Sequence, residues 1–139
     1  MNILVSFELA KMLKEVGFDF PVCNVFETSM LHGRECYFFE KEYELDIDNH
    51  NKKDGENTNY YSRPTIADVV MWLYKKHGIW VCVDKNKESK FKVHISPKDK
   101  NYYVKGIVID GAELNKIEWY NSPREAYIAA IEYALKNLI

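Results

Sequence analysis

Histidine and cysteine are the side chains in this sequence that can exchange protons, attack a substrate or hold a metal ion near neutral pH. The four histidines and three cysteines are scattered, and none of them falls in an H-E-x-x-H or C-x-x-C motif. Cys23, His32 and Cys36 offer three zinc ligands, but a fourth ligand at a zinc-finger spacing is missing. The loop that begins at Asp46 is similar to a calcium loop at first sight, yet its sixth position holds Asn51 where such a loop needs glycine. We therefore expect neither a metal ion nor a cofactor.

General acid–base catalysis would depend on His94, which alternates outward with Lys92 on a predicted strand. An imidazole acts as a base in this way only when the fold brings a carboxylate to it, and the acidic segment 34–56 is the expected source. The sequence contains no glycine-rich phosphate-binding motif and no G-x-S-x-G motif. An enzyme is therefore the third functional hypothesis, and no catalytic residue is assigned.

Lysines and tyrosines are interleaved in the segment 85–105, a pattern that can follow a nucleic-acid backbone and stack its bases. From Thr65 onward the expected element order is that of a double-stranded RNA-binding domain, but the basic cluster at the start of the last helix is missing. The net charge of −2 gives no general affinity for nucleic acid. The lysines also have an explanation that needs no ligand, since charged side chains at strand ends and hairpin tips oppose aggregation of exposed strand edges. Nucleic-acid binding is thus the alternative hypothesis. Its predicted contacts are Lys85, Lys87, Lys90, Lys92, Lys98, Lys100 and Lys105.

Aromatic residues make up 14% of the chain. Most of them fall in strand candidates, where β propensity accounts for them. Trp80 and Cys82 lie on the strand face opposite Ile79 and Val81. If helices cover the Ile79 face, an uncovered Trp80 face would mark a partner surface. We expect the N-terminal strands to cover it and Cys82 to be a small buried side chain. The predicted partner surface comprises Trp80, Tyr102, Trp119 and Tyr120.

Three capped helices with apolar stripes are the clearest structural signals. Ser6 precedes a helix that ends at Gly17. Thr65 and Asp68 form a capping box for a helix that Gly78 closes. Ser122, Pro123 and Glu125 begin a helix that runs to Leu138, and four alanines give it a face suited to close packing on a sheet.

Alternating and apolar runs predict short strands before and after the central helix. They cover residues 22–26, 35–39, 43–47, 79–84, 90–96, 102–110 and 117–120. The segment 48–62 begins with eleven residues that lack a large apolar side chain, so we expect an exposed loop there. The sequence thus predicts one α+β domain over residues 1–139, with three helices and an antiparallel sheet of about 5–7 strands in the order α-β-β-β-α-β-β-β-α.

The chain of 139 residues is long enough to bury a core as one domain. We find neither an apolar stretch of transmembrane length nor a signal peptide, so we expect a cytoplasmic protein without membrane contact.

Three segments of the sequence resemble segments in a group of small proteins from phages, prophages and other mobile elements of gut bacteria. They are residues 7–18, the helix from Pro64–Thr65 that ends in Lys76–Ile79, and Ser122–Ala126. The resemblance implies a mobile-element origin, and the group has no established activity to carry over. Our leading hypothesis is therefore a non-enzymatic accessory protein that acts through a protein partner or as a homodimer.

Overall fold

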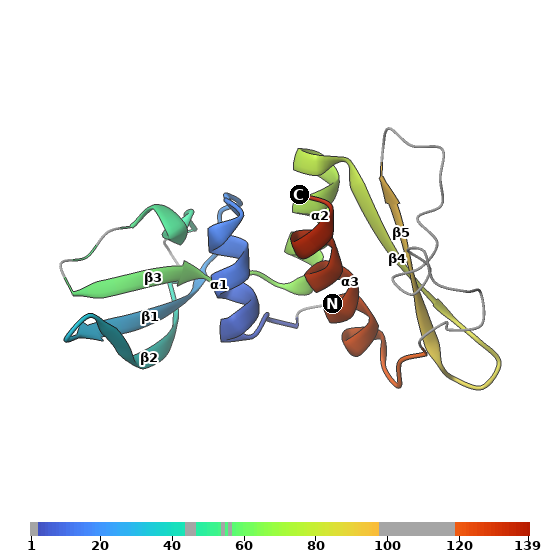
Figure 1. Cartoon of the computed structure of the whole chain (residues 1–139), viewed down its shortest axis with the longest axis horizontal. Helices are drawn as coiled ribbons and strands as arrows, with labels where there is room; N and C mark the ends of the chain where they lie inside the picture. Colours follow the sequence, from blue (N-terminus) through green and yellow to red (C-terminus); the bar gives the residue numbers. More distant parts are fainter. Residues whose placement is uncertain (1–2, 44–46, 54, 56, 98–118) are drawn as a thin grey trace. The chain divides into compact units, whose positions relative to one another are not determined.

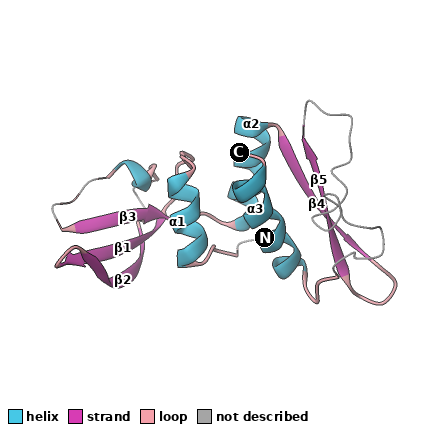
Figure 2. Ribbon diagram, viewed as in Figure 1, coloured by secondary structure: helices cyan, strands magenta, loops and turns pink. Residues whose placement is uncertain are grey.

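The computed structural model describes residues 3–43, 47–53, 55, 57–97 and 119–139 (Figures 1 and 2). Three helices and antiparallel strands confirm the predicted α+β class. The helices are α1 (Phe7–Glu15), α2 (Ile66–His77) and α3 (Pro123–Asn137). The strands are β1 (Asn24–Leu31), β2 (Arg34–Glu42), β3 (Thr58–Ser62), β4 (Ile79–Lys85) and β5 (Phe91–Pro97).

The described strands form two sheets rather than the one sheet predicted, because each strand pairs with strands close to it in the sequence. One sheet has the order β2-β1-β3, and the other is the β4–β5 hairpin. The chain divides correspondingly into an N-terminal unit, residues 1–68, and a C-terminal unit, residues 69–139, which we describe separately.

The first two helices begin where the sequence predicts. The Leu9 amide donates to Ser6 Oγ at 3.2 Å, which satisfies a free amide at the start of α1. Before α2, the Asp68 amide donates to Thr65 Oγ1 at 3.1 Å, and the Thr65 amide donates to Asp68 Oδ2 at 2.8 Å. These reciprocal bonds confirm the capping box, with aspartate in place of the usual glutamate.

A two-residue turn joins β1 and β2 into a hairpin. His32 and Gly33 both have positive φ, +52° and +76°, as a type I′ turn requires. The register of the pair shifts between Ser29 and Met30, which marks a β-bulge. Among the described strands, β2 pairs only with β1, so it forms an edge of the sheet.

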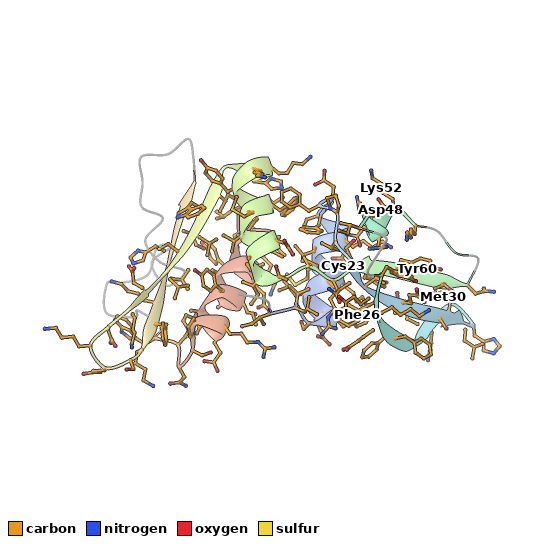
Figure 3. All side chains as sticks on the ribbon, turned by 180° about the vertical axis from the view of Figure 1, so that it is seen from behind. Cys23, Phe26, Met30, Asp48, Lys52 and Tyr60 are labelled. Atoms are coloured by element: carbon orange, nitrogen blue, oxygen red, sulfur yellow. The ribbon has the colours of Figure 1, made fainter. Side chains whose placement is uncertain are left out.

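Helix α1 packs on this sheet through an aromatic cluster. The Phe7 ring lies 5.3 Å from Phe26, 5.0 Å from Phe38 and 5.3 Å from Tyr61, measured between centroids. Figure 3 labels Phe26 within the sheet that carries this cluster. The remaining apolar core of the N-terminal unit comprises Val5, Leu9, Ala10, Leu13, Phe18, Val22, Val25 and Ile66.

The prediction of an exposed loop over 48–62 is wrong. The segment holds the short helix η1 (His50–Lys52) and β3, and the His50 side chain has no exposed surface. His50 Nε2 lies 2.8 Å from the Val22 carbonyl oxygen, and its ring stacks on Tyr43 at 5.4 Å. A segment without large apolar residues can thus enter the core, because a polar ring with a hydrogen-bond partner can be buried.

Asn51 ties η1 to two other elements of the N-terminal unit. Its backbone amide donates to Ser62 Oγ at 3.2 Å, and its Oδ1 accepts from the Ser62 amide at 2.8 Å. Its Nδ2 donates to the Phe18 carbonyl at 3.0 Å. One side chain therefore links the end of β3 and the segment after α1. Asp48 and Lys52, on either side of this link, are labelled in Figure 3.

In the C-terminal unit, α3 packs against β4 and β5. Ser122 Oγ accepts from the Glu125 amide at 3.2 Å, as predicted. Figures 1 and 3 show α2 and α3 on the same side of the hairpin, also as predicted. Small side chains let α3 approach the sheet closely, and larger apolar ones fill the layer between them. The side chains of Ala126, Ala130, Ile131 and Ala134 are fully buried, and Trp72 and Leu73 of α2 are at most 1% exposed.

Several predicted strands lie wholly or partly outside the described residues, namely 43–47, 102–110 and 117–120. Tyr43 is described and is not in a strand, whereas Tyr120 forms an isolated antiparallel bridge with Phe91. No helix in the described part of the chain has the length and apolar character needed to cross a membrane.

Candidate interaction surface

The two faces of the β4–β5 hairpin differ in chemistry, because successive side chains of a strand point in opposite directions. The inward side chains are apolar and at most 4% exposed: Ile79, Val81, Val93 and Ile95. The outward side chains are polar or aromatic, and we call their surface the outer face. It comprises Trp80, Cys82, Asp84, Lys92, His94 and, beside Lys92, Trp119.

Trp80 stands near the start of β4 on the outer face and is 45% exposed. The expectation that this face is covered is therefore wrong at Trp80. The edge of its indole meets the Tyr74 ring of α2 at 5.4 Å and an interplanar angle of 80°. Gly78, with φ +66°, turns the chain between the two aromatic side chains. Trp80 is thus held in place by Tyr74 while much of its surface remains accessible.

Trp119 is a second accessible indole, 41% exposed, at the other end of the outer face. Backbone hydrogen bonds of 2.9 and 2.7 Å join Phe91 and Tyr120, so Trp119 lies across from Lys92. The Lys92 ammonium group is 5.8 Å from the centroid of the Trp119 ring, within the range of a cation–π contact. Of the predicted partner-surface residues, the structure thus places Trp80 and Trp119 on one face, with half-buried Tyr120 next to Trp119.

The turn between the strands carries part of the predicted lysine cluster. Asn86 Oδ1 accepts from the amides of Glu88 and Lys90, both at 2.9 Å, and so fixes the turn. Lys85 and Lys87 are exposed there, while the Lys90 ammonium group donates to the side chain of Asn121. The four lysines on the described hairpin therefore lie at the turn and on the adjoining end of the outer face.

His94 does have a carboxylate partner, but not one from the acidic segment 34–56. Its Nε2 lies 2.7 Å from Asp84 Oδ2, and the two side chains are 31% and 54% exposed. In the register of the hairpin, His94 is directly opposite Cys82, and Asp84 is the next outward residue along β4. Among the described residues, the carboxylate beside His94 thus comes from the neighbouring strand.

The prediction that Cys82 is buried is also wrong, since its side chain is exposed on the outer face. An apolar run in the sequence does not reveal which of its side chains face the core. In β4 alternate side chains point outward, and Cys82 is one of them. Burial raises the pKa of the Tyr127 hydroxyl on α3, and the nearby Cys82 thiol adds to that increase. Cys82 therefore lies within electrostatic reach of α3 while remaining open to solvent.

Part of both predicted sites falls outside the described residues: Tyr102 of the partner surface, and Lys98, Lys100 and Lys105 of the nucleic-acid contacts. Within the described ranges, no three His, Cys, Asp or Glu side chains are grouped as metal ligands. The described part of the outer face presents two indoles, lysines, a thiol and a histidine–aspartate pair.

Tyr74 and Asp84 are the residues of this surface that the sequence did not single out. Asp84 ends an apolar run and could have been paired with His94 only if the register of β4 and β5 had been known. Tyr74 is exposed on α2, and its ring contacts Trp80 because the chain turns between them at Gly78.

The comparisons with known proteins give no relative. No protein-family model matches the chain, and neither a curated protein nor a solved structure is significantly similar to it.

Proposed function

We propose that this chain is a non-enzymatic binding protein that engages a protein partner through the outer face. The observation that carries the proposal is the exposure of two indoles, Trp80 at 45% and Trp119 at 41%, on one side of a single hairpin. Tryptophan is strongly enriched among the residues that dominate binding energy, and large exposed aromatic side chains mark interaction sites. An origin in a phage or other mobile element, which the sequence resemblance implies, and a cytoplasmic location belong to the same proposal.

The spacing and charges of the outer face define the kind of partner. Trp119 is across from Lys92, which pairs with Asp84. Asp84 is four positions along β4 from Trp80, which displaces the two indoles by about 13 Å along the strand, and Trp119 is also two strands away from β4, about 10 Å across the strands. Lysines surround the Trp119 end. The partner should therefore offer two apolar pockets about 16 Å apart, with carboxylates beside the pocket that receives Trp119.

The test is capture from a native-host extract with the wild-type chain and a W80A/W119A double variant. A dominant interface tryptophan contributes 2 kcal/mol or more, so we expect the double variant to bind the purified partner at least about 30-fold more weakly. Affinity is measured by titration calorimetry after the partner has been identified.

Phe39→Ala is the matched control, because Phe39 is 57% exposed but lies on β2, in the N-terminal unit. It should bind with wild-type affinity. Equal binding by the double variant and the wild type would refute the proposal. A wild-type dimer that the double variant dissociates, observed by analytical ultracentrifugation, would identify the partner as a second copy of the chain.

A second function, binding of single-stranded nucleic acid, is favoured by the Lys92 ammonium group over the Trp119 ring. Proteins of this kind combine stacking aromatics with cations that follow the phosphates. The hairpin residues 79–97 carry four lysines against two acids, Asp84 and Glu88.

Fluorescence anisotropy of labelled oligonucleotides decides between the two functions. If nucleic acid is the ligand, affinity should fall at least about tenfold between 50 and 200 mM salt, since neutralised phosphates release counterions. K85E/K87E should then bind more weakly at low salt. No anisotropy change with single- or double-stranded oligonucleotides at 50 mM salt would exclude the nucleic-acid function.

A further inference from the structure

We propose that the partner of the outer face is a second copy of this chain, which contributes the exposed ring of Phe38 and the carboxylates beside it. The inference rests on the proposed function, because it names the partner of the same surface. Three observations support it: the opposite net charges of the two units, the exposure of Phe38, and the matching spacing of ring and charge on the two surfaces.

The two units of the chain carry opposite net charges. Residues 1–68 include thirteen acidic and seven basic side chains, a net charge of −6. Residues 69–139 include eight acidic and twelve basic side chains, a net charge of +4, and the two values together give the −2 of the whole chain. Opposite potentials attract two surfaces during encounter, and like charges disfavour the wrong orientations. Two copies therefore associate best when the N-terminal unit of one meets the C-terminal unit of the other.

Strand β2 presents an exposed ring and carboxylates on the side of the sheet that faces α1. Phe38 stacks on Phe7 of α1 at 5.0 Å, yet it is 53% exposed. Alternation along the strand places Glu40 and Glu42 on the same side as Phe38, and both residues are exposed. The Glu40 carboxylate pairs with Arg63 at 3.2 Å, and its side chain is 57% exposed. This surface has the apolar contact and the neighbouring carboxylates that the Trp119 end of the outer face requires.

The spacing of ring and charge is similar on the two surfaces. The Lys92 ammonium group lies 5.8 Å from the centroid of the Trp119 ring. Glu40 is two positions from Phe38, about 7 Å along the strand. Contact between the two aromatic rings therefore brings the ammonium group to the carboxylate. Because a carboxylate accepts at both oxygens, Glu40 can bind this group as well as Arg63.

Each chain carries both surfaces, so two copies that exchange them form two equal contacts. Such an exchange gives a dimer with twofold symmetry, the commonest form of soluble oligomer. The contact uses side chains rather than the backbone of the β2 edge. Phe39 takes no part, because alternation directs it to the side of β2 opposite Phe38, and it therefore serves as the control here too.

Sedimentation velocity of the full chain tests the inference, with loading concentrations of about 1–200 µM at about 50 mM salt. We expect a dimer whose share grows with concentration. At about 500 mM salt its dissociation constant should rise at least about tenfold, because salt screens the attraction. Phe38→Ala should weaken the dimer about tenfold, whereas Phe39→Ala, at an equally exposed ring, should leave it unchanged.

Reversal of the charges tests which two surfaces meet. E40K/E42K and K85E/K87E should each weaken the dimer at least about tenfold, because like charges then face each other. An equimolar mixture of the two variants should dimerise again, since each contact in the mixed dimer joins opposite charges. Circular dichroism checks that the variants fold. Glu42→Lys, at an exposed position without the Arg63 pair, replaces the first variant if loss of that pair unfolds it.

A chain that remains monomeric up to about 200 µM would overturn the inference, and so would a mixture of the two variants that remains monomeric. A dimer that E40K/E42K leaves intact would overturn it as well, since the acidic side of β2 would then lie outside the interface. None of these results decides the proposed function. That function fails only when W80A/W119A and the wild type bind the captured partner equally.

Discussion

Replacing Trp72 with alanine is expected to lower the free energy of unfolding by about 3–5 kcal/mol, the cost typical of truncating a fully buried aromatic residue. Trp72 lies in α2, is 1% exposed and meets the His77 ring at 4.7 Å. Domains of this size are stable by roughly 5–15 kcal/mol, so the variant should unfold at much lower denaturant concentration. Guanidinium titration followed by circular dichroism measures the change.

Trp119→Ala provides a matched control, because it removes the same side chain at a position that is 41% exposed. Its effect on unfolding should stay below about 1 kcal/mol. Comparable losses in the two variants would show that Trp119 is a packing residue and would remove one of the two anchors proposed for the outer face. The comparison thus separates structural from interaction tryptophans within a single experiment.

Asn51→Ala should destabilise the N-terminal unit by about 3 kcal/mol, because it leaves two backbone groups without partners. The Ser62 amide, on a residue with no exposed surface, loses the acceptor at 2.8 Å, and the Phe18 carbonyl loses the donor at 3.0 Å. Amide hydrogen exchange reports this change locally. We expect faster exchange at Ser62 and through β3.

Asn57→Ala is the control for this variant, since Asn57 is exposed and its backbone carbonyl, rather than its side chain, accepts from Met30. It should change the free energy of unfolding by less than about 0.5 kcal/mol. If Asn51→Ala were equally mild, water would be replacing the lost amide, and η1 would not depend on this side chain for its position.

The elements with strong local signals could be predicted from the sequence. The caps at Ser6, Thr65 and Ser122 act over three residues, so they do not depend on the rest of the fold. The strand alternation around Trp80 was predicted in the same way. Segments governed by distant partners could not be predicted. His50 lies in a polar segment that looks like a loop, and its buried ring contacts the Val22 carbonyl and Tyr43, both distant in the sequence.

Some features of the candidate site could likewise be predicted from the sequence, and others could not. The outward positions of Trp80 in β4 and His94 in β5 follow from the period-two alternation of side chains within each strand. The pairing of His94 with Asp84 depends on the relative register of two strands, which a shift of one residue would abolish. Exposure could not be predicted at all, because it depends on what the remaining chain covers. The sequence favoured a buried Cys82 and a covered Trp80, and both are accessible.

The bulge in the β1–β2 hairpin has a consequence for how this protein behaves at high concentration. Among the described strands, β2 is an edge strand, and it carries two large exposed rings, Phe38 and Phe39, a combination that favours aggregation. The bulge at Ser29/Met30 interrupts the regular ladder, and charged residues occupy both ends of the strand, from Arg34–Glu35 to Glu40–Glu42. A second strand would meet an irregular edge flanked by charges. The bulge and the flanking charges therefore both oppose the pairing of this edge with the strand of a second molecule.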